Sequence, residues 1–385
     1  MKVLRITRSM DPAQGGVVEA INQAAMSFNN DSFQTEVLCL DDPDSEWVKN
    51  QSHYTIHALG EGITAYGFHR KYLSWLWQNS KNYDVIIIDG LWQFLVLGGY
   101  ILKILNVPYC VFTHGMLDPY FNKEKLKFIK KLPFWFGIER NVIALASAVI
   151  FTCRDEYLLA SNSFPLFRAR EKITTLGVEG NSRESSELVS SFYTEFPTLA
   201  NKKFAIFLSR INKKKGIDLL VGALGRMKNL PEDFQLAIAG PDSEGLQLKL
   251  TQQIELLGLT DRVVWLGMLK GDVKWGAYHA SEVFILPSHQ ENFGIVVAEA
   301  LSTGTPVLIT NKVNIWREVI TAGAGFVEND DIDGVEELLS QWFSLGIQSR
   351  RNMKADAITC FQKNFSIDAS TRDLERVLLN VSKSK

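Results

Sequence analysis

Two successive series of short apolar runs, separated by helix-length segments, constrain the fold of this 385-residue chain more than any other feature. The runs of the first series lie at 2–7, 35–40, 83–90, 108–115 and 147–153. Those of the second lie at 204–210, 234–240, 262–267, 282–288, 306–310 and 323–328. Continuous apolar strands that alternate with helices, such as the one predicted over 16–28, form parallel sheets covered on both faces. The pattern therefore predicts an α/β chain with two doubly wound units.

The predicted domain boundaries follow from the break between the two series. The segment 179–203 is polar, rich in Ser and Glu, and contains a proline, so we expect the inter-domain linker inside or beside it. We accordingly predict one domain over 1–185 and a second over 200–365. The stretch 368–383 is amphipathic, and we expect the terminal segment 366–385 to be a helix that packs back on the N-terminal domain.

Composition and charge exclude several functional classes. The net charge is −2, which gives no case for binding nucleic acid. The four cysteines have no metal-ligand spacing, which predicts reduced core cysteines: Cys39, Cys110, Cys153 and Cys360. The N-terminus lacks the apolar stretch of a signal peptide, and the apolar segment 90–107 is interrupted by Lys103. We therefore expect a cytoplasmic protein in which 90–107 is a buried helix.

Two loops of the second series have phosphate-binding chemistry. In the first, Arg210 and the lysines 213–215 follow an apolar strand and precede Gly216. Ligands of open α/β sheets bind beyond the carboxyl ends of the strands, where Arg and Lys side chains suit a diphosphate. In the second, Gly240 follows a strand and permits a close approach of the backbone to a ligand. A solvated basic turn and a plain strand-to-helix turn are the alternatives.

Two glutamates, Glu291 and Glu299, stand eight positions apart in "HQENFGIVVAEALSTGTPV". Helical spacing would leave them within about 80° around the axis and about 12 Å apart along it. That separation is too large to share a proton or a metal, but it suits two ends of an extended polyhydroxylated ligand. Free amides of residues 293–296 at the helix start would hold a phosphate between them. The combination predicts a nucleotide sugar, with a salt-bridged helix residue as the alternative for Glu299.

The stretch "ENFGIVVAE" resembles the E-x7-E motif of family 4 retaining glycosyltransferases. Supporting motifs follow the order of that family at 209–216, 237–245, 264–269 and 301–310, and the stretches 14–21 and 113–119 also fit. The resemblance implies the GT-B fold, in which two Rossmann-like domains face each other across a cleft. It implies that the N-terminal domain lies on the acceptor side and that the C-terminal domain binds the nucleotide-sugar donor.

The resemblance also implies roles by position. Arg210 and Lys215 would bind the donor diphosphate, Glu299 the ribose hydroxyls and Glu291 the transferred sugar. The implied donor-binding residues are, in chain order, Gly15, Gly16, Arg210, Lys215, Gly240, Met268, Leu269, Glu291, Asn292, Phe293, Gly294, Ile295 and Glu299. Among them, Met268 and Leu269 would lie by the nucleobase, and Gly15 and Gly16 would line the cleft.

The implied catalytic set is His114, Glu291, Arg210 and Lys215. His114 would approach the anomeric centre or the acceptor, and Asp118 would orient it or contact the acceptor. A histidine that caps the core is the alternative for His114. His289 and Gln290 before the motif depart from the family pattern, as does Pro-Asp-Ser after Gly240, so donor choice stays open.

The mechanism implied by the resemblance is metal-independent retention. Built-in cations would stabilise the leaving diphosphate, and no carboxylate is clearly placed as a covalent nucleophile. The Asp-x-Asp stretches at 42–44 and 331–333 are interpreted as solvated turns. No cofactor or metal is expected. UDP-glucose is the favoured donor and GDP-mannose the next, with a saccharide or lipid-linked acceptor in polysaccharide biosynthesis.

The segment 122–143 mixes lysines with aromatic residues. It predicts either a peripheral contact with anionic membranes, at the inner face, or a core helix with a basic solvent face. Two other functional classes stay open for the whole chain. One is a GT-B epimerase or phosphorylase, which would turn over a sugar without a separate saccharide acceptor. The other is a non-catalytic nucleotide-sugar-binding subunit. A dehydrogenase is disfavoured because no GxGxxG follows the strand 2–7.

Overall fold

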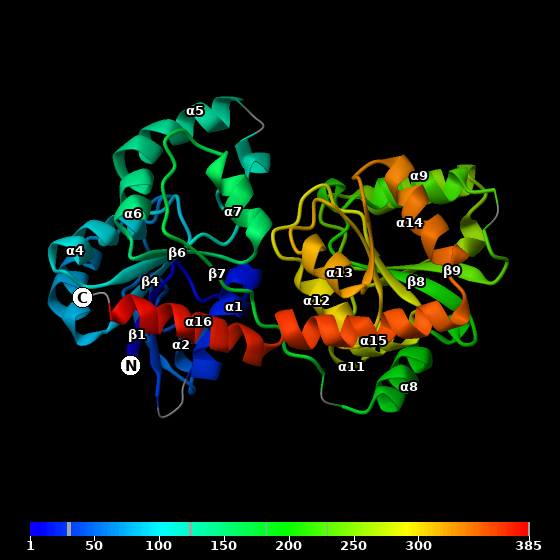
Figure 1. Cartoon of the computed structure of the whole chain (residues 1–385), viewed down its shortest axis with the longest axis horizontal. Coiled ribbons are helices and arrows are strands. Elements are labelled where there is room, and N and C mark those ends of the chain that lie inside the picture. The colour runs from blue at the N-terminus through cyan, green and yellow to red at the C-terminus, as the bar shows by residue number, and fades with distance from the viewer. Residues whose placement is uncertain (29–31, 123–124, 182, 229, 384–385) are drawn as a thin grey trace. The chain divides into compact units, whose positions relative to one another are not determined.

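The computed structural model describes residues 1–28, 32–122, 125–181, 183–228 and 230–383 (Figure 1). The chain forms two compact units. Unit 1 comprises Met1–Gly177 with Ile367–Lys385, and unit 2 comprises Val178–Ser366. Each contains a parallel sheet covered by helices, which confirms the predicted pair of doubly wound α/β units.

Unit 1 has a seven-stranded sheet in the order β3-β2-β1-β4-β5-β6-β7. Its strands are β1 (Lys2–Ile6), β2 (Gln34–Cys39), β3 (Thr55–Ala58), β4 (Val85–Asp89), β5 (Tyr109–Phe112), β6 (Ala148–Phe151) and β7 (Glu171–Ile173). Its α-helices are α1 (Gly16–Phe28), α2 (Glu46–Lys49), α3 (Tyr72–Asn79), α4 (Gly98–Ile104), α5 (Lys125–Phe134), α6 (Arg140–Leu145), α7 (Arg154–Ser161) and α16 (Ile367–Ser382). Its shorter turns are the 3-10 segments η1 (Pro12–Gln14), η2 (Ser80–Asn82), η3 (Phe94–Leu97) and η4 (Pro119–Asn122), and the π-helix η5 (Trp135–Glu139).

Unit 2 has a six-stranded sheet in the order β10-β9-β8-β11-β12-β13. Its strands are β8 (Lys203–Leu208), β9 (Phe234–Ala239), β10 (Val263–Gly267), β11 (Val283–Leu286), β12 (Val307–Thr310) and β13 (Gly325–Glu328). Its α-helices are α8 (Ser185–Glu195), α9 (Ile217–Arg226), α10 (Leu246–Leu256), α11 (Gly271–Ala280), α12 (Ile295–Ser302), α13 (Trp316–Ala322), α14 (Ile332–Ser344) and α15 (Ile347–Asn364). The 3-10 segments are η6 (Pro197–Leu199), η7 (Lys213–Lys215) and η8 (Thr260–Arg262).

The strand order places a switch point in each sheet. In unit 1 the chain leaves β1 toward β2 on one side and continues on the other side at β4. In unit 2 the same reversal falls between β8 and β11. Loops diverge at such a point, which leaves room for a ligand beyond the carboxyl ends of the strands. These two edges are therefore the places to look for a site.

The boundary between the units, at Gly177 and Val178, lies directly beside the polar segment 179–203. The segment 179–203 contains α8, whose Leu188 and Phe192 are buried. Gly276 of α11 allows this close packing, because a Cβ there would collide with the carbonyl oxygen of Leu188. The polar sequence of α8 reflects its exposed face, so this segment belongs to unit 2.

The terminal helix α16 belongs to unit 1 and lies beside α1 (Figure 1). Leu374, Val377, Leu378 and Val381 contribute to the same buried cluster as Val3 of β1. Their spacing of three and four residues is that of one helical face. Burial of this face explains why the chain returns to unit 1 after completing unit 2.

Some local expectations were wrong. The segment 90–107 forms two short helical pieces, η3 and α4, in place of one helix. The edge strands β3 and β7 were not predicted, because neither has a continuous apolar run and β7 is exposed throughout. All four cysteines are buried and free, as predicted. Within the described part of the chain, no helix combines the length and apolar character needed to cross a membrane.

Candidate active site

In unit 2, the loops after β8 and β11 meet at the switch point. The amide of His289 donates to the carbonyl oxygen of Lys214 at 2.8 Å. Gly216 has φ of 67°, and a Cβ there would collide with the carbonyl oxygen of Pro287. This approach brings the Lys215 ammonium into a salt bridge with Oε2 of Glu291. The lysine is only 7% exposed, so a fixed cation and a carboxylate share a largely desolvated corner.

Glu291 is held by backbone pairing, not by the helix. Its amide donates to the Lys312 carbonyl at 2.9 Å, and its carbonyl accepts from the Asn314 amide at 3.0 Å. Gly294, with φ of 77°, separates this loop from the first turn of α12. The helical spacing of about 80° and about 12 Å does not apply to Glu291 and Glu299, because Glu291 lies outside α12.

Glu299 lies within α12 and contacts α11 with both carboxylate oxygens. Lys274 Nζ lies 2.8 Å from Oε1, and the Tyr278 hydroxyl donates to Oε2 at 3.0 Å. Burial, and secondarily this carboxylate, raises the pKa of Tyr278 well above its ordinary value, so the phenol acts as a hydrogen-bond donor. Glu299 is thus salt-bridged, as in the alternative interpretation, and a ribose would have to share or replace these contacts.

The loops after β8, β9 and β10 also contact one another. Gly240 donates its amide to the Gly267 carbonyl at 2.7 Å, and a Cβ on Gly240 would collide with the carbonyl oxygen of Ser209. The glycine is thus required by the chain's own loop, and any approach to a ligand stays a prediction. This packing positions the exposed Arg210 at the same edge as Lys215.

The other predicted donor residues of unit 2 differ in exposure. Met268 is exposed and Leu269 is buried just after β10. Phe293 is buried and packs edge-on against Phe365, with ring centroids 5.6 Å apart, so its side chain serves the core. Asn292 and Ile295 are partly exposed. Arg210, Lys215, Glu291 and the start of α12 therefore lie around one edge of the unit 2 sheet.

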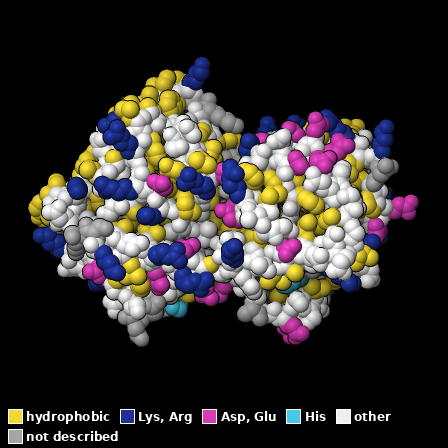
Figure 2. Space-filling model, viewed as in Figure 1, with side chains coloured by type: hydrophobic (Ala, Val, Ile, Leu, Met, Phe, Trp, Pro, Cys, Tyr) yellow, Lys and Arg dark blue, Asp and Glu magenta, His cyan; other side chains and the backbone are white. Residues whose placement is uncertain are grey.

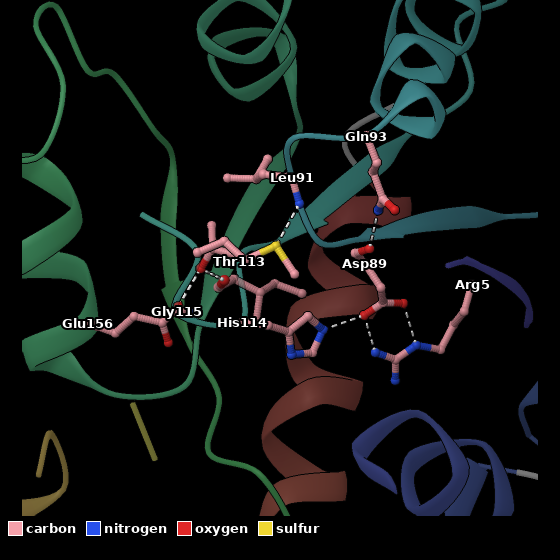
Figure 3. Close-up of polar contacts among 10 residues, drawn as sticks. Arg5, Asp89, Leu91, Gln93, Thr113, His114, Gly115 and Glu156 are labelled. Carbon is pink, nitrogen blue, oxygen red and sulfur yellow. Dashed lines mark hydrogen bonds and ion pairs between the residues drawn. The ribbon is translucent and has the colours of Figure 1, made fainter. Parts of the chain in front are cut away.

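In unit 1, His114 follows β5 in a left-handed conformation with φ of 47°. Its Nε2 lies 2.7 Å from Oδ1 of Asp89, the last residue of β4 (Figure 3). Asp89 also accepts from Nε and Nη2 of the buried Arg5 at 2.9 and 2.5 Å. The imidazole stacks on Phe112, with ring centroids 4.1 Å apart. Its side chain is 3% exposed, so His114 is fixed in orientation from two sides.

The carboxylate of Asp89 is buried between the side chains of Arg5 and His114. Burial acts to raise the pKa of Asp89, but Arg5 and His114 outweigh it and hold the pKa below its ordinary value. Asp89 is therefore an anion that bridges a permanent cation and an imidazole. A carboxylate that orients an imidazole and stabilises its protonated form is a common arrangement for histidines that exchange protons.

Glu156 of α7 holds the turn that carries His114. It accepts hydrogen bonds from the Thr113 hydroxyl at 2.5 Å and the Gly115 amide at 2.7 Å (Figure 3). It also accepts from the Thr152 amide and hydroxyl at 2.7 and 2.6 Å. These contacts compensate for burying its charge. Asp118 is buried and accepts from the Tyr120 amide at 2.8 Å, which stabilises the turn that follows.

A pocket of about 440 Å³ lies at the switch point of unit 1. Its lining residues come from the ends of β1 and β4, the start of α1 and the loop after β5: Thr7, Arg8, Ser9, Gln14, Val17, Val18, Asp89, Leu91, Trp92, Gln93 and Met116. Gly15 and Gly16 stand in the chain between Gln14 and Val17, and Gly15 has φ of 79°. Asp89 links this pocket to His114.

Sequence reasoning did not identify Asp89, Arg5 or Glu156. Asp89 ends the apolar strand "VIIID", and Arg5 interrupts the apolar strand "KVLRI", so both had a local signal. A charge at the end of a buried strand, or within it, must find a partner. Glu156 had no such signal, since its position in the first turn of α7 is common for an acidic residue.

Comparisons with known proteins agree with this architecture. Residues 194–359, all in unit 2, match the family model of "Glycosyl transferases group 1". A D-inositol 3-phosphate glycosyltransferase of Salinispora tropica is 32% identical over 176 residues, which are 44% of this chain and 36% of that protein. A 2-deoxystreptamine N-acetyl-D-glucosaminyltransferase of Niallia circulans is 26% identical over 284 residues, 69% of each chain. The first three curated relatives are covered over only 36% to 51% of their length.

The likeness in structure extends over both units. Anabaena Alr3699/HepE, solved in complex with UDP-glucose, superposes with a TM-score of 0.73 at 19% identity, covering 99% of this chain and 100% of that one. At this identity the likeness establishes the fold. The chain thus has the GT-B fold, and its unit 2 matches the family of group 1 glycosyl transferases.

Proposed function

We propose that the protein is a family 4 retaining glycosyltransferase, with Glu291 and Glu299 as its E-x7-E motif. It would transfer a hexosyl unit from a nucleotide sugar to a saccharide or lipid-linked saccharide in polysaccharide biosynthesis. The observation that carries this proposal is the Lys215–Glu291 salt bridge at the carboxyl ends of β8 and β11. It lies within the region that matches group 1 glycosyl transferases.

The donor is proposed to be UDP-glucose, with GDP-mannose next. Support for a uridine nucleotide comes from Anabaena Alr3699/HepE, which was solved with UDP-glucose. Support for a mannosyl donor comes from the name of a relative, the lipopolysaccharide core biosynthesis mannosyltransferase LpsB of Rhizobium meliloti. That name also favours a saccharide acceptor.

In the proposed mechanism, Lys215 and Arg210 stabilise the charge that develops on the leaving diphosphate. The bond from the anomeric carbon to the diphosphate oxygen breaks, and a bond to the acceptor oxygen forms on the same face. The acceptor proton passes to the leaving phosphate. Glu291 accepts hydrogen bonds from hydroxyls of the sugar, and before the donor binds it forms a salt bridge with Lys215. These residues supply the positive charge without a metal.

His114 is proposed to act on the acceptor side, since it lies at the carboxyl end of the unit 1 sheet with Asp89 behind it. A neutral imidazole accepts a hydrogen bond from a hydroxyl, and Asp89 favours the tautomer with the proton on Nε2. His114 would then use Nδ1 to orient the hydroxyl that attacks.

A peripheral membrane contact through 122–143 is part of the proposal. Residues 123 and 124 lie outside the described residues. On α5, Leu126 and Ile129 are 75% and 58% exposed; Phe134 at the end of α5 and Phe136 of η5 are also exposed. Figure 2 shows apolar and basic side chains intermixed over this part of unit 1. Such a mixture suits the interface of an anionic bilayer.

A panel of nucleotide sugars in a thermal-shift assay tests the donor, because a ligand that binds the native state raises Tm. We expect UDP-glucose to stabilise the wild type. Lys215→Ala should reduce kcat/KM for transfer about 10- to 100-fold, from loss of a charge-assisted contact of about 1.5–3 kcal/mol. Lys202→Ala, at an exposed position just before β8 and so at the opposite end of that strand from Lys215, is the matched control. Turnover without a saccharide acceptor, or a product of inverted configuration, would contradict the proposal.

The membrane contact is tested by pelleting with phosphatidylglycerol-containing vesicles. Leu126→Ser with Ile129→Ser should abolish binding at low salt. Leu158→Ser, at an exposed leucine of α7, should leave it unchanged. Failure of the wild type to pellet at low salt removes the membrane contact from the proposal and leaves the enzymatic part intact.

A further inference from the structure

A second pocket in unit 1, of about 630 Å³, combines aromatic side chains with three lysines. We call it the lysine–aromatic pocket, and its lining residues are Trp92, Met116, Tyr120, Phe121, Lys127, Lys130 and Lys131. No acidic residue is among these described lining residues. The chain as a whole is slightly acidic, so this local excess of positive charge is a specific feature of the pocket.

The three lysines come from one face of α5, where their spacing of three and four residues places them next to one another. Lys131 Nζ lies 5.0 Å from the centroid of the Trp92 ring and 3.1 Å from the Asn122 amide oxygen. Burial, and then repulsion from Lys127, lowers the pKa of Lys131. The repulsion between these like charges costs free energy, which a bound anion would offset.

The pocket adjoins the one at the switch point of the unit 1 sheet. Trp92 and Met116 line both. The Trp92 indole donates to the Met116 carbonyl at 3.1 Å, and its backbone has φ of 61° and donates to Glu139 at 3.0 Å. The shared wall is therefore fixed in position. A ligand with one end near Asp89 can extend past this wall toward the lysines.

We propose that the lysine–aromatic pocket binds a phosphate or diphosphate group on the acceptor, which places a phosphorylated acceptor in unit 1. This inference rests on the proposed transfer function, because only a transferase has an acceptor. Lysines act as point charges for phosphate oxygens, while Trp92, Tyr120 and Phe121 offer flat apolar surfaces to the group that bears the phosphate.

Calorimetric titration with two soluble probes tests the pocket. Inorganic pyrophosphate carries the charge alone, and geranyl diphosphate adds an apolar group. We expect geranyl diphosphate to bind more tightly, and the double variant Lys127→Gln/Lys130→Gln to weaken its binding at least 10-fold. Lys125→Gln is the matched control, because Lys125 is exposed on the same helix and does not line the pocket. Equal weakening by the control, or unchanged binding in the double variant, would overturn the inference.

Two further arms separate the sources of the signal. Phosphatidylglycerol vesicles present phosphate on a bilayer, and binding to vesicles but to neither soluble probe would overturn the pocket. UDP-glucose affinity of the double variant should equal that of the wild type, since the donor loops lie in unit 2. If no nucleotide sugar binds but geranyl diphosphate still depends on Lys127 and Lys130, the transfer function fails and the anion site stands.

Discussion

The buried carboxyl of Glu139 makes stability depend on pH in a direction that can be measured. Glu139 ends the π-helix η5 and is fully buried. Its Oε1 accepts from the Trp92 amide at 3.0 Å, while Oε2 has no hydrogen-bond partner among the described residues. Burial raises its pKa from 4.5 to about 8, against a smaller lowering by that amide. The folded protein therefore holds this proton at neutral pH, and the unfolded chain releases it.

The sign and size follow from linkage. The unfolded state binds fewer protons than the folded state between pH 4.5 and about 8, so the free energy of unfolding falls as pH rises through that window. Between pH 5 and pH 7 the predicted loss is about 2.5 kcal/mol. Glu139→Gln keeps an oxygen to accept from Trp92 and removes the titration. The variant should therefore gain about 2.5 kcal/mol on the wild type as pH rises from 5 to 7, whatever its stability at pH 5.

Native-state hydrogen exchange of amides in β4 (Val85–Asp89) is the assay, because it reports opening of unit 1 separately from unit 2. Wild type and variant are compared at the same pH, so intrinsic exchange rates cancel. Glu61→Gln, at an exposed position of unit 1, is the control, and its difference in stability from the wild type should be the same at pH 5 and pH 7. A difference between Glu139→Gln and wild type that is the same at pH 5 and pH 7 would refute a protonated Glu139.

Three further substitutions test the site. Asp89→Asn leaves the buried guanidinium and imidazole beside it without their anion, so unit 1 should lose about 3–5 kcal/mol in the same exchange assay. Asp44→Asn breaks a solvent-exposed pair and should cost less than about 1 kcal/mol; equal losses would contradict the argument. Gly240→Ala places a Cβ against the Ser209 carbonyl oxygen at a φ of 138°, so Tm should fall and UDP-glucose binding should weaken, whereas a fully stable variant would show that the loop can move. Glu299→Gln should weaken UDP-glucose binding by calorimetry about 5- to 10-fold, since a charge-assisted contact to hydroxyls is lost; unchanged affinity would leave the residue with its ion pair alone.

Most of the fold was predictable because its signals are local. The helix 16–28 and the buried strands have continuous patterns that a parallel sheet requires. The strand β3 and the helix α8 were not predicted, because their burial is partial and the residues they pack against lie elsewhere in the chain. The division of the segment 90–107 into η3 and α4 was not predictable either, because the apolar pattern runs through both elements without a break.

The candidate site divides in the same way. Loops rich in charge at the ends of strands, such as the one with Lys215, follow from the order of apolar runs, and so does the proximity of neighbouring strand ends. The residue that pairs with each charge cannot be predicted from the order of the apolar runs. Glu291 and Glu299 each pair with a lysine from another loop or helix, 76 and 25 residues away in the chain.

The sequence by itself determined the α/β class, the two doubly wound units and the edges of the sheets where chemistry can occur. Hydrophobic periodicity is a local property, and burial on both faces of a parallel strand leaves a pattern that is read within a few residues. Only the tertiary structure decided that Asp89 orients His114 and that Glu156 holds its turn. Asp89 and His114 are 25 positions apart in the chain, and Glu156 and Gly115 are 41 apart. These contacts exist because adjacent parallel strands bring their carboxyl ends together, and long-range pairing of that kind leaves no periodic trace in the chain.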